Sequence, residues 1–385
     1  MGRTILLPDL YFGMMNGTAL NKSAVFSLLA VFAAVLLGTA GCVLPRVNAP
    51  VGPSEEDQRF AMERVNAAAE ALRTRGDTTA AMNAVKEAFQ LYGGGEADLY
   101  GNGSSAASLI GRQLIDRGQP VFAARYLSDA VKDEKMAQDP LLWSTLAQAY
   151  LVSGDSKNGL SAEQEAERRA DAILAQIGKF QPTTGQPPSP ELQRMVQGFF
   201  HAGTYFSDIR QEPEKSFKVL REALRLLPDN PLTLNQLGYT LADRGTTPEH
   251  FREALTHTRR AAEQMPRNGA VVDSYGWALY KTGDLKASRR ILQQAVSLDP
   301  YVPELQYHLG VVLAALGETH AARIAFQRAL MIQPNYADAR EALTKLPPAT
   351  KEESEPNIPK SSPDVPARTD TNTTRIDSPP KNNAP

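Results

Sequence analysis

The sequence predicts an all-α protein made of stacked helix pairs, and three observations carry that prediction. Pro266, Pro300 and Pro334 recur at intervals of 34 residues, and Gly276 and Gly310 keep the same interval. Each interval divides into two stretches whose apolar residues have helical spacing, for example 302–316 and 320–332. A proline closes each unit, because proline cannot continue a helix but is tolerated in the first turn of the next one.

The composition agrees with such a protein and excludes several others. Of the 385 residues, 42% are hydrophobic and 22% are charged, which excludes a wholly disordered chain and a polytopic membrane protein. The 41 Lys and Arg nearly balance the 43 Asp and Glu, so no nucleic-acid partner is expected. A single cysteine excludes an intrachain disulfide framework and a Cys-rich metal site.

The N-terminal region reads as an export signal. Residues 24–41 carry no charge, follow Lys22 and end in small residues directly before Cys42, the only cysteine. This segment resembles the signal of bacterial lipoproteins, although Thr39 stands where that family usually has leucine. The resemblance implies removal of residues 1–41, lipid attachment at Cys42 and a periplasm-facing protein, with the outer membrane favoured. A single uncleaved inner-membrane anchor is the alternative, because eighteen apolar residues can just span a bilayer, and translation could start at Met1, Met14 or Met15.

The repeats resemble the tetratricopeptide repeat family, most closely in residues 303–334. The residues that stand at the family's positions in this unit are Leu309, Gly310, Leu313, Ala322, Phe326, Ala329 and Pro334. Units 269–300 and 231–266 also match, the latter with about four extra residues around 246–249. The resemblance implies helix-turn-helix pairs that stack into a right-handed superhelical solenoid. Gly276 and Gly310 are expected where the two helices of a pair approach closely.

The rest of the chain follows in order around these units. After a linker at 42–54, residues 55–180 hold degenerate repeats, including a first helix near Trp143 whose second helix is delayed to 161–178. A loop at 181–190 precedes residues 191–346, which hold the better repeats, a unit at 194–228 irregular around Gly203 and Thr204, and a capping helix at 336–346. Residues 347–385 are rich in proline and are expected to be disordered.

Catalytic motifs are not evident. The five histidines form no HExxH, so no metal and no cofactor is expected. The sequence Gly154-Asp155-Ser156 occupies the turn between two helices, the same place as Gly283-Asp284, rather than the elbow of a hydrolase. We therefore expect no enzyme, and the alternative is an enzyme whose catalytic residues are scattered over several repeats.

A binding site is expected on the groove lined by the first helix of each pair. In the family's register, five side chains of each of the three best units face that groove, Glu304 among them, and nine of these are the binding candidates: Asn235, Tyr239, Asp243, Asp273, Trp277, Tyr280, Lys281, Tyr307 and Val311. Tyrosine and tryptophan are enriched at binding hot spots, but some of these rings could instead fill the space between neighbouring helices. The family's clamp for a C-terminal carboxylate is matched only at Asn235, so capture of an acidic tail is not expected.

These observations favour a non-catalytic scaffold of the bacterial cell envelope that binds an extended peptide segment of a partner protein. Such a scaffold could serve assembly of a secretion, pilus, outer-membrane or exopolysaccharide machinery, and self-association through an uncapped repeat edge is a variant. The alternative is a small-ligand or glycan-binding lipoprotein, since aromatic grooves also stack sugars.

Overall fold

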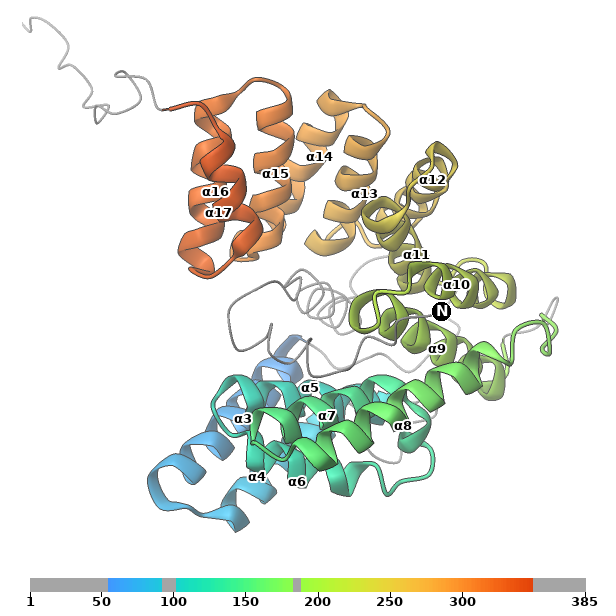
Figure 1. Cartoon of the computed structure of the whole chain (residues 1–385), viewed down its shortest axis with the longest axis vertical. Coiled ribbons are helices and arrows are strands. Elements are labelled where there is room, and N and C mark those ends of the chain that lie inside the picture. Colours follow the sequence, from blue (N-terminus) through green and yellow to red (C-terminus); the bar gives the residue numbers. More distant parts are fainter. Residues whose placement is uncertain (1–54, 92–101, 183–187, 349–385) are drawn as a thin grey trace, which may run out of the picture. The chain divides into compact units, whose positions relative to one another are not determined.

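The computed structural model describes residues 55–91, 102–182 and 188–348, and every regular element in these ranges is helical (Figure 1). The prediction of an all-α protein of stacked helix pairs is confirmed. The predicted signal at 1–41, the linker at 42–54, Cys42 and almost all of the predicted tail at 347–385 lie outside the described residues.

Fifteen α-helices follow one another along the described ranges, together with one short 3-10 helix, η1, and one π-helical turn, η2. They are α3 (Glu55–Arg75), α4 (Thr78–Leu91), α5 (Asn102–Asp116), α6 (Pro120–Ala130), η1 (Met136–Gln138), α7 (Pro140–Val152), α8 (Ser156–Leu174), α9 (Pro190–Thr204), η2 (Tyr205–Ile209), α10 (Pro213–Leu226), α11 (Pro231–Arg244), α12 (Pro248–Gln264), α13 (Gly269–Lys281), α14 (Leu285–Leu298), α15 (Pro303–Ala315), α16 (Thr319–Ile332) and α17 (Ala337–Lys345).

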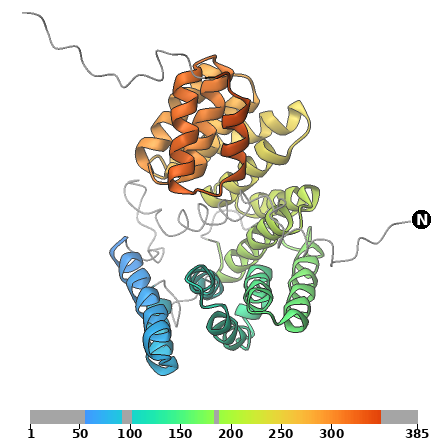
Figure 2. The same ribbon diagram turned by 60° about the vertical axis from the view of Figure 1, so that its left-hand side comes forward.

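The helices pack as consecutive antiparallel pairs, from α3 with α4 to α15 with α16, and α17 packs on the last pair. Each first helix also contacts the first helix of the next pair, so α5, α7, α9, α11, α13 and α15 adjoin one another in chain order. Figure 2 shows this side-by-side packing for residues 269–345. A single hydrophobic cluster runs from Leu141 on α7 to Ala278 on α13, so the predicted loop at 181–190 does not interrupt the core.

Local signals start and end these helices. Side-chain oxygens of Asn230, Asn268 and Asp284 accept hydrogen bonds from the amides three residues later and so cap α11, α13 and α14. The turns inside the pairs contain Gly154, Gly283 and Gly317 at φ +88°, +90° and +78°, a region that favours glycine because it has no Cβ.

Glycines also allow the two helices of a pair to touch. A Cβ built on Gly276 would lie 2.7 Å from Leu292 Cδ2, and one on Gly310 would lie 2.5 Å from Phe326 Cε1. Both distances are far below van der Waals contact, so the expected close approach at these glycines is confirmed. Gly203 on α9 meets Leu220 in the same way.

Three sequence expectations differ from the structure. The helix after the Gly154 turn begins at Ser156 rather than near 161, because Asp155 caps it through the Asn158 amide. The extra residues around 246–249 lengthen α12 to 17 residues, compared with 14 in α14 and α16, instead of forming only a loop. The irregularity near Gly203 is explained by η2, because a π-turn takes up one additional residue.

Candidate functional site

The candidate site is built by α11, α13 and α15, the first helices of the three units that the sequence predicts best. Six of the nine predicted binding residues recur at equivalent places on these helices: Asn235, Asp273 and Tyr307 are each the fifth residue, and Tyr239, Trp277 and Val311 the ninth. Fifth and ninth residues are one helical turn apart and share a face. We call the surface that these residues share with Glu304 and His308 the first-helix face.

The structure divides the nine residues into two groups. Asn235, Tyr239, Asp273 and Trp277 are buried, with exposed fractions of 3%, 9%, 3% and 6%. The other five are partly buried: Asp243, Tyr280, Lys281, Tyr307 and Val311. The rings of Tyr239 and Trp277 therefore fill the space between helices, as in the alternative interpretation. The partly buried residues form the part of the first-helix face that solvent reaches.

Two polar contacts tie the three helices together. Tyr239 Oη on α11 donates a hydrogen bond of 2.7 Å to Glu304 Oε1 on α15, reaching past α13. His308 Nδ1 on α15 lies 2.7 Å from Asp273 Oδ2 on α13, and its Nε2 lies 3.9 Å from Glu304 Oε1. Glu304 and His308 are functional candidates that the choice of nine residues left out. Their spacing of four places them on one side of α15, which was the available signal.

Aromatic rings cover this polar cluster. The Trp277 ring stacks on His308 at 4.1 Å between centroids and on Tyr280 at 4.9 Å, with interplanar angles of 16° and 24°. Lys281 Nζ lies 5.2 Å from the Trp277 ring centroid, within the range of a cation–π interaction. Tyr307 packs edge-on against Tyr336, which precedes α17.

Burial changes the acidity of the groups beneath the rings. Removal from water raises the pKa of Glu304 to about 7, and the carboxylates of Asp273 and Asp243 add to this effect against His308 and the Tyr239 hydrogen bond. Burial by itself would lower the pKa of His308, but Asp273, Glu304 and Asp243 together raise it above its ordinary value. The carboxylates around His308 therefore favour its protonated form, while Glu304 changes charge near neutral pH.

Several polar atoms of the first-helix face make no hydrogen bond within the described part of the chain. These atoms are Asn235 Oδ1, Asp273 Oδ1 and Trp277 Nε1, two acceptors and one donor. Buried polar groups are nearly always paired, because an unpaired one costs about 1–3 kcal/mol. The three atoms therefore mark the first-helix face as a place where a further donor and acceptor could be taken up.

A second buried polar cluster joins the first helices of the earlier units. His201 on α9 places Nδ1 2.9 Å from Asp139 Oδ2, at the start of α7, and Nε2 3.3 Å from Ser105 Oγ on α5. These are the residue types of a hydrolytic triad, but the exposed fractions of Ser105, Asp139 and His201 are only 7%, 7% and 4%. Sequence reasoning missed this cluster because its members are scattered over three repeats.

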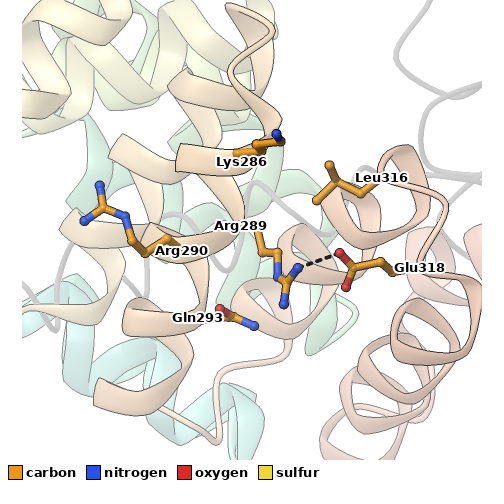
Figure 3. A pocket seen from close by; sticks show the side chains of 6 residues that line it. All are labelled: Lys286, Arg289, Arg290, Gln293, Leu316 and Glu318. Carbon is orange, nitrogen blue, oxygen red and sulfur yellow. Dashed lines mark hydrogen bonds and ion pairs between the residues drawn. The ribbon is translucent and has the colours of Figure 1, made fainter.

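A cationic pocket of about 350 Å³ lies elsewhere, between α14 and the turn from α15 to α16 (Figure 3). Lys286, Arg289, Arg290 and Gln293 of α14 line it, together with Leu316 and Glu318 of the turn. Arg289 Nη1 forms an ion pair of 2.6 Å with Glu318 Oε1, which occupies one wall. None of the nine predicted residues lines this pocket.

The described ranges contain neither a metal-binding cluster nor a membrane-spanning helix. There, no three His, Cys, Asp or Glu side chains are grouped so that they could hold a metal ion. None of the helices in those ranges combines the length and the apolar character that crossing a bilayer requires.

Comparison with known proteins shows what part of the chain is similar to. Residues 279–346 match the tetratricopeptide repeat family. A curated TPR repeat-containing protein of Pseudomonas aeruginosa is 37% identical over 163 residues, which make up 42% of this chain and 24% of that protein. The match therefore spans about a quarter of the relative's length.

Solved structures with a similar fold include a tetratricopeptide repeat protein from Parabacteroides merdae and YrrB, described as a TPR protein with an unusual peptide-binding site. The first is 13% identical and covers 74% of this chain and 98% of its own, with a TM-score of 0.44. The second is 18% identical and covers 57% of this chain and 99% of its own, with a TM-score of 0.33.

Proposed function

We propose that this chain, which carries tetratricopeptide repeats, is a non-catalytic scaffold whose first-helix face binds an extended segment of a partner protein. Tetratricopeptide repeat proteins are typically non-catalytic and bind peptide segments of their partners. The observation that carries the proposal here is the combination of partly buried aromatic side chains, Tyr280 and Tyr307, with unpaired polar atoms on Asn235, Asp273 and Trp277.

The chemistry of an extended peptide matches that combination. A peptide backbone offers an N–H donor and a C=O acceptor at each residue, and these could pair with Asn235 Oδ1 and Trp277 Nε1. Aromatic side chains supply contact area at a small cost in conformational entropy. Because the rings of Trp277 and Tyr239 are themselves buried, Tyr280, Lys281 and Tyr307 would make the first contacts with the partner.

We further propose that the scaffold is anchored as a lipoprotein in the cell envelope. The support is the apolar stretch 24–41 directly before Cys42. A lipidated N-terminus with two or more acyl chains holds a protein stably on a membrane. We favour the outer membrane, with the repeats facing the periplasm and supporting assembly of an envelope machinery.

Site-specific photo-crosslinking tests the binding face. A photoreactive amino acid is introduced at Tyr280 and, as the matched control, at Tyr301, which is 84% exposed in the loop before α15. The proposal expects one or a few discrete adducts from position 280 that position 301 does not give. The same adducts from both positions, or none from position 280, would remove the first-helix face from the site.

The anchor is tested separately by Cys42→Ser. Loss of lipidation should leave the signal segment uncut and change the membrane fraction in which the protein is found. If the variant is processed and fractionates like the unmodified chain, Cys42 is not the attachment site.

A further inference from the structure

The first-helix face carries more negative than positive charge. Five carboxyl groups lie close enough to influence the same titrations: Asp208, Asp243, Asp273, Glu304 and Asp338. Of the cations nearby, Arg244 pairs with Asp243 at 2.7 Å and His308 pairs with Asp273. Lys281 lies over Trp277. Among the described residues, Glu304 Oε1 accepts a hydrogen bond from the Tyr239 hydroxyl and lies 3.9 Å from His308 Nε2.

The unpaired atoms point to the same kind of ligand. Asn235 Oδ1 and Asp273 Oδ1 are acceptors without a donor, and both residues are 97% buried at equivalent positions on neighbouring helices. A ligand that satisfies both acceptors must bring at least two N–H donors. The arginine guanidinium has five donors in a planar fork, no acceptor and a permanent positive charge.

The rings complete this recognition chemistry. Guanidinium groups stack on aromatic faces, and tryptophan is the best partner for a cation. Lys281 Nζ already occupies the space 5.2 Å from the Trp277 ring centroid, so a cation is accepted there. Lys281 and Tyr280 are only partly buried, and an incoming side chain could displace them without opening the helix pairs.

We propose that the segment bound by the first-helix face presents an arginine, whose guanidinium stacks beside Trp277 and donates to Asn235 Oδ1 and Asp273 Oδ1 while Glu304 and Asp243 balance its charge. This inference rests on the proposed function, because it assigns the chemistry of the partner at the same face. An acidic segment would be repelled by the carboxylates of this face. A lysine ammonium lacks the planar fork of donors with which a guanidinium satisfies two separated acceptors.

Binding of this kind releases protons. Glu304 has a pKa of about 7 in the free protein, and a neighbouring guanidinium favours its charged form. The groups that influence Glu304 are Asp208 on η2, Tyr239 and Asp243 on α11, Asp273 on α13, His308 on α15 and Tyr336 before α17. Ionisation of Glu304 makes the face more negative, so affinity should rise as the pH increases through about 7.

The probe is a displayed library of random twelve-residue peptides selected on the detergent-solubilised full chain. We expect enriched peptides to share an arginine. Replacing that arginine by citrulline, which keeps the shape and removes the charge, should weaken binding by about tenfold or more, as measured by fluorescence anisotropy. Replacement by lysine should weaken it less than citrulline, and affinity should rise between pH 6 and pH 8.

Asn235→Leu is the decisive variant. It removes an acceptor that has no hydrogen-bond partner among the described residues, so thermal stability should be kept, while affinity for the arginine peptide should fall about tenfold. Gln294→Leu makes the same kind of change at an exposed position of α14 and should leave affinity unchanged.

Each outcome decides between the two proposals. Loss of binding in Tyr280→Ser shows that a selected peptide binds the first-helix face. If such peptides carry no arginine, or if they tolerate citrulline in its place, the arginine proposal is overturned and the scaffold proposal still stands. Peptides whose binding is unaffected by both Tyr280→Ser and Asn235→Leu would overturn both.

Discussion

Replacing Gly310 by alanine tests whether close approach of the two helices in a pair governs the stability of a unit. The added Cβ would lie 2.5 Å from Phe326 Cε1 and 2.6 Å from Cδ1, whereas ordinary contact is 3.4–4 Å. Phe326 is 1% exposed and belongs to the core formed by α15 and α16. Its ring cannot move away without displacing other core side chains.

Two opposing effects set the size of the change in the free energy of unfolding. Overpacking a well-filled core costs about 1–3 kcal/mol, and alanine gains up to about 1 kcal/mol over glycine inside a helix. The net result should be a free energy of unfolding lower by about 1–2 kcal/mol. Gly198→Ala on α9 is the matched control, because the nearest atom to its added Cβ is Ile173 Cδ1 at 3.9 Å. That variant should gain about 0.5–1 kcal/mol.

Urea unfolding followed by circular dichroism measures both variants, and hydrogen exchange shows whether the loss lies in α15 and α16, since stacked repeats can open locally. In the background of Phe326→Ala, the Gly310→Ala change should cost at least about 0.5 kcal/mol less, because the ring that it meets is gone. If Gly310→Ala stabilises the protein as much as Gly198→Ala does, the close-approach argument is wrong.

Three further predictions concern buried charge and helix capping. The folded-state pKa of Glu304, about 7, lies above its ordinary 4.5, so this group makes stability fall as pH rises from about 4.5 through 7. Glu304→Gln should remove that contribution and be about 1–3 kcal/mol more stable than the unmodified protein at pH 8. If the urea midpoint of the unmodified protein is the same at pH 5 and pH 8, this prediction is wrong. His201→Ala removes the imidazole that lies 2.9 Å from the buried Asp139 Oδ2 and should cost about 1–3 kcal/mol, measured by thermal melting; a loss below about 0.5 kcal/mol would show that water replaces the imidazole. Asp284→Ala removes the side-chain cap of α14 and should cost about 1 kcal/mol, more than Glu318→Ala at the start of α16, where the side chain makes no capping bond.

Much of the fold could be predicted because its signals are local or periodic. The interval shared by Pro300 and Pro334 sets the unit length, and the glycine turns at Gly283 and Gly317 separate the two helices. Gly276 and Gly310 keep the same place in successive units and indicate close approach, because a larger side chain there would push the two helices of the pair apart. The start of α8 was placed too late, because the single capping bond of Asp155 counts for more than the distance to the next apolar residues.

The candidate site was harder to predict than the fold. The family register assigns the candidate residues to one face of the first helices, but a register cannot say whether a ring is exposed or covered, and Tyr239 and Trp277 are covered. Glu304 and His308 join the site through contacts with residues 65 and 35 positions away in the chain. Ser105 and His201 are 96 positions apart, a separation over which no local motif exists.

By itself, the sequence determined the helical class, the unit length, the turns and the helix pairs, because each depends on spacings within one repeat. Only the tertiary structure decided which side chains of different repeats share a face, which carboxylates lose their water, and which polar atoms stay unpaired. Those properties depend on the distance between successive first helices, and that distance is set by packing across units that no single repeat contains.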